Sequence, residues 1–176
     1  MDAQTQNLFL IGYRGTGKTT VAACLARRLD WPWIDADAHL EQTAGRTIRE
    51  IFASEGEAGF RLRESAVLEE LCRRKNHIIA TGGGVVLSAD NRQRLKQSGR
   101  VIWLTADPPT ILRRIERDPS TAARRPVLSV GGLAEIEQLL TVREPWYRDC
   151  ADLIVETADR SPEEIAEIVF RSLNPG

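Results

Sequence analysis

The sequence predicts a single α/β domain built on a five-stranded parallel sheet with helices on both faces. Short apolar segments alternate with longer amphipathic ones along the chain, which is the pattern of strands connected by helices. The first apolar segment, 8–11, is continuous, as expected of a strand that is buried on both faces. Glycine-rich or acidic motifs follow three of the segments, at the sheet edge where such folds bind ligands.

Five segments are the expected strands, and the first three lead into residues that could bind a ligand or take part in catalysis. The first stops at Gly12, the second ends in Asp35 and Asp37, and the third runs into Gly82. In chain order the segments are 8–11, 33–37, 77–80, 101–104 and 153–155.

Helices are expected between these strands. From Lys18 onward an apolar residue recurs at every fourth position from Val21 to Leu29, which predicts a helix packed on the sheet. Residues 39–71 have a mostly helical pattern, interrupted at Gly56 and Gly59.

The second half of the chain contains two further helical regions. Residues 107–147 are expected to form a helix, an arginine-rich polar stretch and another helix. The Ser-Pro-Glu-Glu sequence at 161–164 predicts the start of the last helix, with a serine cap and a capping box. We therefore expect one domain over residues 1–176, with insertions at about 38–62 and 114–128.

The composition argues against several classes of protein. The net charge is −1 over 176 residues, whereas domains that bind nucleic acid are usually strongly basic, so the charge argues against a nucleic-acid-binding protein. No apolar run approaches the ~18 residues of a membrane span, and residues 1–7 lack the basic start of a signal peptide. Three cysteines without a CxxC pair favour neither disulfides nor zinc. We expect a cytoplasmic monomer that binds neither nucleic acid nor membrane.

Residues 12–19, Gly-Tyr-Arg-Gly-Thr-Gly-Lys-Thr, match the phosphate-binding pattern G-x-x-x-x-G-K-[ST] between a strand and a helix. Glycines allow backbone N–H groups to surround a phosphate chain, and the helix N-terminus adds partial positive charge. Lys18 would reach the β- and γ-phosphates, and the Thr19 hydroxyl would bind Mg²⁺. The expected nucleotide-binding residues of this segment are Gly12, Gly15, Thr16, Gly17, Lys18, Thr19 and Thr20.

Further motifs follow in order along the chain. They are Asp35-x-Asp37, Phe60-Arg61-x-x-Glu64, Thr81-Gly82-Gly83-Gly84, Arg125-Pro126 and Arg143-x-x-x-Tyr147. Together with residues 12–19 they resemble the shikimate kinase family, from Asn7 to about Phe170. Six motifs in this order are far more specific than any one of them alone.

The resemblance implies a P-loop kinase that transfers the γ-phosphate of ATP to the 3-hydroxyl of shikimate. The products would be shikimate 3-phosphate and ADP, in aromatic amino-acid biosynthesis. Lys18, Asp37 and Arg125 would be catalytic, with Asp37 near the attacking oxygen. Arg61 and Arg143 would grip the shikimate carboxylate. The implied substrate-binding residues are Asp37, Arg61, Gly82, Gly83, Gly84 and Arg143.

The resemblance also assigns the metal and the remaining nucleotide contacts. Asp35, with Thr19, would hold Mg²⁺. Arg160 stands in the loop that packs on the adenine in this family. The first insertion would bind the acceptor, and the second, 114–128, would be a mobile lid that brings Arg125 to the phosphates.

Each motif has a structural alternative when it is taken singly. The glycine-rich segments can be turns without a ligand, and Asp35 can cap a helix. Arg61 can pair with Glu57 or Glu64 on a helix surface. Arg143 can cap a helix C-terminus. Only the joint occurrence of the motifs favours the catalytic interpretation.

The sequence also departs from a common P-loop pattern. No apolar strand ends in Asp-Glu, so the usual second carboxylate for the metal is missing and Asp35 is left to serve it. The lid looks longer than in the shortest family members, which leaves open whether Arg117, Arg124 or Arg125 reaches the phosphates. Nothing in the sequence explains Trp146.

Two other functions remain as alternatives. The first is another P-loop small-molecule kinase, acting on gluconate or a nucleoside monophosphate, although Asp37, Arg61 and Arg143 suit a small hydroxy acid. The second is a non-catalytic nucleotide-binding protein. The chain lacks the Asn-Lys-x-Asp of a GTP switch, and it retains Lys18 and Asp37.

Overall fold

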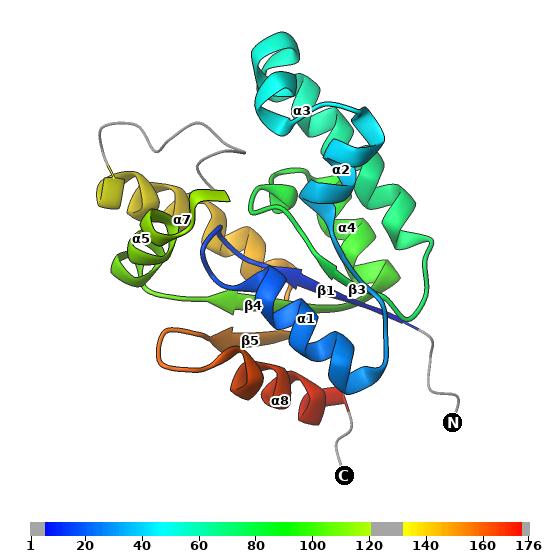
Figure 1. The fold of residues 1–176 in the computed structure, drawn as a ribbon, viewed down its shortest axis with the longest axis vertical. Helices are drawn as coiled ribbons and strands as arrows, with labels where there is room; N and C mark the ends of the chain where they lie inside the picture. The colour runs from blue at the N-terminus through cyan, green and yellow to red at the C-terminus, as the bar shows by residue number, and fades with distance from the viewer. Residues whose placement is uncertain (1–5, 121–131, 174–176) are drawn as a thin grey trace.

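The computed structural model describes residues 6–120 and 132–173, and it contains one five-stranded parallel sheet in the order β2-β3-β1-β4-β5 (Figure 1). The strands are β1 (Asn7–Ile11), β2 (Trp33–Asp35), β3 (Ile78–Ala80), β4 (Gly99–Thr105) and β5 (Leu153–Glu156). In the centre of the sheet Phe9 of β1 lies opposite Ile79 of β3 and Val101 of β4. The predicted α/β class and all five expected strands are therefore confirmed. Because β3 and β4 both pair with β1 in parallel, the loops that follow these three strands are neighbours.

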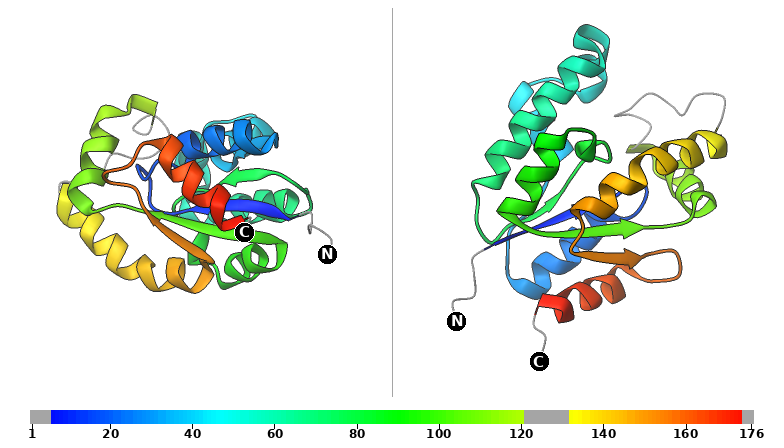
Figure 2. Two further views of the ribbon diagram at one scale, coloured as in Figure 1. Left: turned by 90° about the horizontal axis from the view of Figure 1, so that it is seen from below. Right: turned by 180° about the vertical axis from the view of Figure 1, so that it is seen from behind.

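Helices cover both faces of this sheet (Figures 1 and 2). The helices α1 and α8 pack together on one face, whereas α4 and α7 lie on the other. The elements are α1 (Lys18–Leu29), α2 (Ala36–Ala44), α3 (Ile48–Cys72), η1 (Val85–Leu87), α4 (Ala89–Ser98), α5 (Pro108–Arg117), α7 (Gly132–Cys150) and α8 (Pro162–Leu173).

The core explains why the first strand is continuously apolar. Leu8 and Leu10 of β1 pack in a buried cluster with Leu25 of α1 and Val169 of α8. Phe9, between them in sequence, packs in the opposite cluster with residues of α3, α4 and α7. Successive side chains of a strand point to opposite faces, and here both faces are covered, so every position of β1 is buried.

Two elements differ from the sequence prediction. The second strand ends at Asp35, and Asp37 lies in the first turn of α2, because the Asp35 carboxylate caps that helix by accepting the Ala38 N–H at 2.9 Å. Residues 89–98 form a helix, α4, that the sequence pattern did not predict. Only Asn91 and Leu95 of this polar helix are buried, so its apolar periodicity is too weak to detect.

The predicted helical region 39–71 contains the end of α2 and most of α3. The chain turns at Gly45, where φ is 65°, and Thr47 forms a capping box with Glu50 at the start of α3. Of the two predicted interruptions, only Gly56 leaves helical geometry, with φ 69° and ψ −175°. The capping box predicted at Ser161 is present, with the Glu164 N–H donating to the serine hydroxyl at 3.2 Å.

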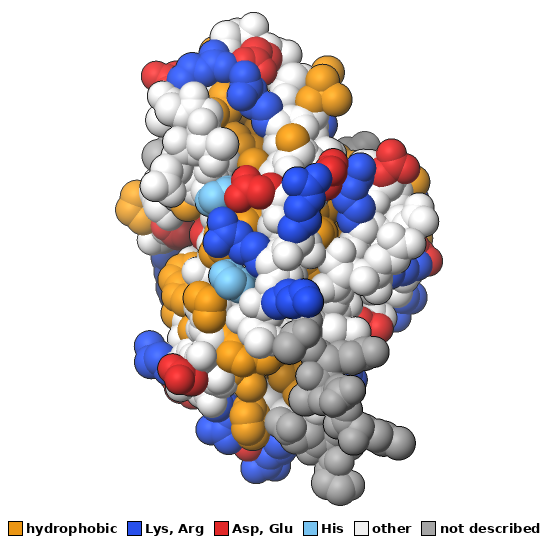
Figure 3. All heavy atoms as spheres, turned by 90° about the vertical axis from the view of Figure 1, so that its right-hand side faces the viewer, with side chains coloured by type: hydrophobic (Ala, Val, Ile, Leu, Met, Phe, Trp, Pro, Cys, Tyr) orange, Lys and Arg blue, Asp and Glu red, His pale blue; other side chains and the backbone are white. Residues whose placement is uncertain are grey.

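Basic and acidic side chains are interspersed on the face shown in Figure 3. Along α3 and just after it, Arg73 pairs with Glu69 at 2.7 Å and Arg74 with Glu70 at 3.3 Å. Arg94 lies 3.7 Å from Glu69. These arginines are matched by carboxylates instead of forming a continuous basic surface.

The helices in 6–120 and 132–173 include none with both the length and the apolar character needed to cross a bilayer. Cys24, Cys72 and Cys150 are free thiols. Desolvation raises the pKa of the Cys150 thiol to about 11, so this buried side chain stays protonated at neutral pH.

A cluster of two arginines around Glu55 secures the bend of α3 at Gly56. The Glu55 carboxylate accepts hydrogen bonds from Nε and Nη2 of Arg63, both at 2.9 Å, and pairs with Arg46 from the α2–α3 connection. The cluster therefore joins both sides of the bend to the preceding turn. Hydrogen bonds from Arg63, and then from Arg46, lower the pKa of Glu55 to about 2.

This pKa predicts the pH range in which the cluster stabilises the fold. Because the folded pKa of Glu55 lies below the ordinary value of 4.5, its contribution is complete above pH 4.5 and is lost as the pH falls toward 2. Glu55→Gln should therefore lower the free energy of unfolding at pH 6, and its difference from the wild type should narrow by pH 3. Urea unfolding at both values measures this, with Glu137→Gln on exposed α7 surface as the control. A constant difference would contradict the account.

Candidate active site

The loop between β1 and α1 has the geometry of a phosphate-binding loop. Three of its residues have positive φ, namely Gly12 at 140°, Gly15 at 80° and Gly17 at 90°. Residues other than glycine rarely adopt such φ values, so the glycines of the motif are needed for this turn. Lys18, the first residue of α1, reaches back over the loop and donates to the carbonyls of Gly12 at 2.7 Å and Tyr13 at 3.0 Å. Its ammonium group therefore lies at the loop that it would serve.

The start of this loop lies against the neighbouring strand. A Cβ atom at Gly12 would collide with the backbone carbonyl oxygen of Leu104 in β4. The loop is therefore fixed on the sheet by backbone packing, and it depends on glycine for close approach as well as for its φ.

Thr19 and Asp35 bring two oxygen-bearing side chains together beside the loop. The Thr19 hydroxyl donates to Oδ2 of Asp35 at 2.9 Å, while Oδ1 of Asp35 caps α2. The predicted structural role of Asp35 as a helix cap is thus confirmed, and it coexists with the contact to Thr19. Hydroxyl and carboxylate oxygens are the ligands that Mg²⁺ prefers. In the described part of the chain, no group of three His, Cys, Asp or Glu side chains could hold a metal by itself.

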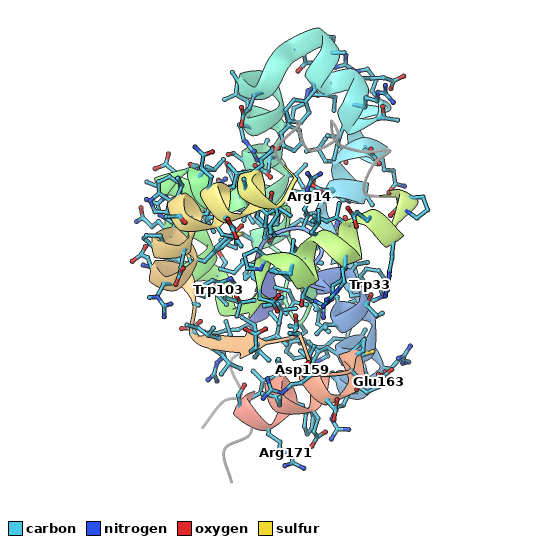
Figure 4. All side chains as sticks on the ribbon, turned by 90° about the vertical axis from the view of Figure 1, so that its left-hand side faces the viewer. Arg14, Trp33, Trp103, Asp159, Glu163 and Arg171 are labelled. Atoms are coloured by element: carbon cyan, nitrogen blue, oxygen red, sulfur yellow. The ribbon has the colours of Figure 1, made fainter. Side chains whose placement is uncertain are left out.

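A cavity of about 460 Å³ lies over the phosphate loop. Figure 4 shows Arg14 of the loop in the middle of the molecule, where α5, α7 and the α2–α3 pair converge. The cavity contains most of the sequence-predicted residues, namely Gly15, Thr16, Gly17, Lys18, Thr19, Thr20, Asp35, Asp37, Gly82, Gly83 and Arg160. The cavity is lined by the basic side chains of Arg14 and Lys18 and by the carboxylates of Asp35 and Asp37, and the N-terminus of α1 adds partial positive charge.

The glycine run Gly82–Gly84 follows β3 and lies directly against the phosphate loop. A Cβ atom at Gly83 would stand 3.3 Å from the Arg14 nitrogen and 3.4 Å from the Gly12 oxygen. Two backbone segments that are far apart in sequence therefore touch at the carboxyl edge of the sheet.

Arg61 of α3 lies beside the same glycine run. Its Nη1 donates to Glu64 at 2.8 Å and its Nη2 to Glu57 at 3.4 Å, so both pairs that the sequence offered as an alternative are present. The guanidinium also covers Gly84, where a Cβ atom would collide with it. Its Nε is buried and has no hydrogen-bond partner within residues 6–120 and 132–173.

Arg143 of α7 lies against Tyr13 of the phosphate loop. Its guanidinium lies 5.6 Å from the centre of the Tyr13 ring, and the Tyr13 Cα is 3.6 Å from the Cβ position of Gly83. Its Nε, too, is buried without a hydrogen-bond partner among the residues that the structure describes. Arg143 lies well inside α7, so the predicted alternative as a C-terminal cap is wrong. Arg61 therefore lies next to the glycine run, and Arg143 lies next to Tyr13 of the phosphate loop that packs on this run. Neither arginine lines the 460 Å³ cavity.

Arg114 lines the cavity, although the sequence motifs predicted no ligand contact for it. It donates to the Thr157 side chain and carbonyl, both at 2.9 Å, and to the Gly15 carbonyl at 3.3 Å. It therefore joins the phosphate loop to the end of β5. The expected lid began at residue 114, but this residue lies inside α5. The helix cap at Asp107 was the local sequence signal that could have predicted α5 at this position.

The remaining predicted residues lie at the rim of the cavity or beyond the described chain. Arg160 is exposed, lines the cavity and donates to the Glu156 carbonyl at 2.6 Å. Arg117 is the last residue of α5. Arg124 and Arg125, together with most of the expected lid, lie outside the described residues. Trp146 packs half-buried on the core, with the Arg92 guanidinium 5.5 Å from its ring centre.

A phosphate-binding loop on a parallel sheet, with a cavity that joins it to acidic and basic side chains, defines the class of P-loop kinases of small molecules. Comparison with known protein families narrows this class. The family described as shikimate kinase matches residues 14–174 of the chain. The chain belongs to the shikimate kinase family.

Individual members of this family are similar in sequence to nearly the whole length of the chain. The shikimate kinase of Rhodopirellula baltica is 44% identical over 172 residues, which are 97% of this chain and 92% of that protein. The shikimate kinase of Burkholderia lata is 42% identical, over 95% of this chain and 89% of that protein.

Solved structures give the same result for the fold. The shikimate kinase from Acinetobacter baumannii in complex with shikimate has a TM-score of 0.91 and 38% identity, over 97% of this chain and 94% of that chain. A gluconokinase from Sinorhizobium meliloti has a TM-score of 0.61 at 15% identity, over 97% of this chain and 93% of that one. The second likeness shows the shared fold alone.

The geometry at Gly12 predicts a large loss of stability on substitution. Gly12→Ala adds a collision with Leu104 to the cost of an unfavourable φ, together about 3 kcal/mol or more in the free energy of unfolding. Gly45→Ala is the matched control, because Gly45 also has positive φ but nothing lies within 4 Å of its Cβ position. It should cost only about 1–2 kcal/mol. Equal losses in urea unfolding would contradict the close approach.

Proposed function

We propose that the chain transfers the γ-phosphate of ATP to the 3-hydroxyl of shikimate, forming shikimate 3-phosphate and ADP. In this role it serves aromatic amino-acid biosynthesis. The observation that carries the proposal is the contact of the glycine run with the phosphate loop, flanked by Arg61 and Arg143. A donor phosphate and a small acid bound at these two segments would be adjacent, as phosphoryl transfer requires.

The nucleotide phosphates occupy the loop of residues 12–20 in this proposal. Backbone N–H groups of the loop and the N-terminus of α1 surround the phosphate oxygens. Lys18 exchanges its bonds with the loop carbonyls for the β- and γ-phosphates, where it neutralises the charge that develops during transfer. Arg160, at the rim of the cavity, packs on the adenine. Arg125 reaches the phosphates from the lid.

Thr19 and Asp35 are the proposed protein ligands of Mg²⁺, with Asp35 acting through water. The fit rests on their oxygen atoms, which lie 2.9 Å apart beside the phosphate loop. Bound Mg²⁺ supplies positive charge to the phosphate oxygens. The hydrogen bond from the Ala38 N–H holds the Asp35 side chain in place for this role.

The acceptor binds between the glycine run and the two arginines. Forked donors such as Arg61 and Arg143 suit a carboxylate, and a bound carboxylate supplies the acceptor that their buried Nε atoms lack. Asp37 lines the same cavity as the phosphate loop. In this proposal its carboxylate accepts the proton of the attacking hydroxyl or orients that hydroxyl. Gly82, Gly83 and Gly84 let the sugar-like ring approach the backbone.

The same proposal includes the organisation of the chain. It is a single kinase domain and acts as a cytoplasmic monomer without nucleic-acid or membrane partners. The insertion at about 38–62 binds the acceptor, and the lid at about 114–128 excludes water from the phosphates. Because Arg114 is held in α5 by Thr157 and Gly15, we place the hinge of the lid after this residue.

An acceptor screen tests this function. Purified protein with ATP and Mg²⁺ should form ADP rapidly with shikimate, and not with gluconate or nucleoside monophosphates. A coupled assay of ADP, with and without each acceptor, measures this. The reverse preference would identify another small-molecule kinase, and nucleotide binding without turnover of any acceptor would identify a non-catalytic protein. Either result would end the proposal.

Arg61→Lys should weaken acceptor binding selectively. Lysine keeps the charge but loses the fork, so the KM for shikimate should rise about tenfold, equivalent to ~1.4 kcal/mol, while the KM for ATP changes less than about twofold. Steady-state kinetics with each substrate varied in turn measure both constants. Arg73→Lys, in an exposed ion pair just after α3, is the control and should change neither. An unchanged KM for shikimate would remove Arg61 from the acceptor site.

A further inference from the structure

We infer that Tyr147 is a positioning residue of the acceptor site: its hydroxyl sets the orientation of the Gly83–Gly84 peptide beside Arg61. Tyr147 belongs to the Arg143-x-x-x-Tyr147 motif, but nothing in the proposed chemistry uses it. The inference rests on the proposed function for its link to shikimate. Its link to the glycine run rests on geometry alone.

Two separate contacts fix the Tyr147 side chain. It is fully buried, and its ring stacks on Trp103 of β4 with 5.5 Å between ring centres and 22° between planes. Its hydroxyl donates to the carbonyl oxygen of Gly83 at 2.5 Å. A phenylalanine could fill the same space against Trp103, so the hydroxyl is the part of the side chain that serves the glycine run.

In the segment after β3 the Gly82 and Gly84 carbonyls accept from backbone N–H groups, whereas three others accept from side chains. Asn91 of α4 donates to the Val85 carbonyl at 3.1 Å, and Arg92 donates to the Val86 carbonyl at 2.7 Å. Tyr147 does the same for Gly83 from α7. Of these three carbonyls, that of Gly83 belongs to the residue that packs on the phosphate loop.

Fixing one carbonyl also fixes the next amide. The described chain contains no cis peptide bond, and a planar trans peptide directs its C=O and the following N–H to opposite sides. With the Gly83 carbonyl turned toward Tyr147, the Gly84 N–H is turned away from α7. Gly84 is the residue that the Arg61 guanidinium covers. An acid held by Arg61 therefore lies next to a peptide whose orientation is set by Tyr147.

The same helix carries both contacts to the acceptor site. Arg143 lies one turn before Tyr147, and its guanidinium faces Tyr13 of the phosphate loop. A shift of the glycine run relative to α7 would therefore change its distance from Arg143 as well as from Arg61. The hydrogen bond from Tyr147 therefore fixes the position of the glycine run relative to α7, and the glycine run in turn packs on the phosphate loop.

Tyr147→Phe tests the inference, because it removes only the hydroxyl and leaves the ring stacked on Trp103. The KM for shikimate should rise about fivefold to tenfold, as expected for a misplaced binding surface, with the KM for ATP nearly unchanged. In ¹H–¹⁵N spectra of the substrate-free protein, the Gly84 amide signal should shift or split. Val169→Ala, a buried truncation on the opposite face of the sheet, controls for lost stability and should do neither.

Each result decides one part of the inference. An unchanged Gly84 signal in Tyr147→Phe would overturn the positioning role. A shifted signal with an unchanged KM for shikimate would overturn the link to the acceptor, as would an equal effect of Val169→Ala. If the wild type does not phosphorylate shikimate, the proposed function fails, and the amide spectrum still confirms or overturns the effect of Tyr147 on the glycine run.

Discussion

The contact between two glycine-containing backbone segments at the carboxyl edge of the sheet is the constraint on which the site depends. Because β1 lies between β3 and β4, the loops that leave these strands must share the same small space. Gly12 approaches Leu104 of β4, and Gly83 approaches Gly12 and Arg14. A Cβ atom at Gly12 would collide with Leu104, and one at Gly83 would fit only tightly against Arg14 and Gly12. The sheet order and the glycines together determine how closely two ligands could approach.

The surrounding helices add charge to this backbone arrangement. Helix α1 brings Lys18 over the phosphate loop, α3 brings Arg61 against Gly84, and α7 brings Arg143 against Tyr13. Each cation is already held by carbonyls, carboxylates or an aromatic ring. Long basic side chains lose considerable conformational freedom when they bind a ligand, and these contacts reduce that cost in advance.

Local patterns in the sequence predicted most of the fold and many of the cavity residues. The continuous apolar strand 8–11, the glycines of residues 12–19 and the capping box at Ser161 are each set by neighbours in sequence, so they could be identified directly. Asp35 and Arg61 show the limit of such reasoning. Each has the structural contacts that the sequence offered as alternatives to function, and these contacts leave it beside the predicted site.

What could not be predicted depends on contacts between distant segments. Arg114 is held by hydrogen bonds to Thr157 and Gly15, and Tyr147 by a hydrogen bond to Gly83. The partners in each pair are far apart in the sequence, so no local pattern connects them. Helix α4 has too few buried residues to produce an apolar period, yet its Asn91 supports the segment after the glycine run. In this protein, residues that hold the site together are harder to predict than residues that would touch a ligand.

The most direct measurement is a crystal structure of this chain with ADP and shikimate bound. The account predicts the shikimate carboxylate between the guanidinium groups of Arg61 and Arg143. It also predicts the ring over Gly83 and a hydroxyl of the acceptor beside Asp37, facing the terminal phosphate of ADP. A carboxylate that contacts neither arginine, or a ring on the far side of the phosphate loop, would contradict the central claim.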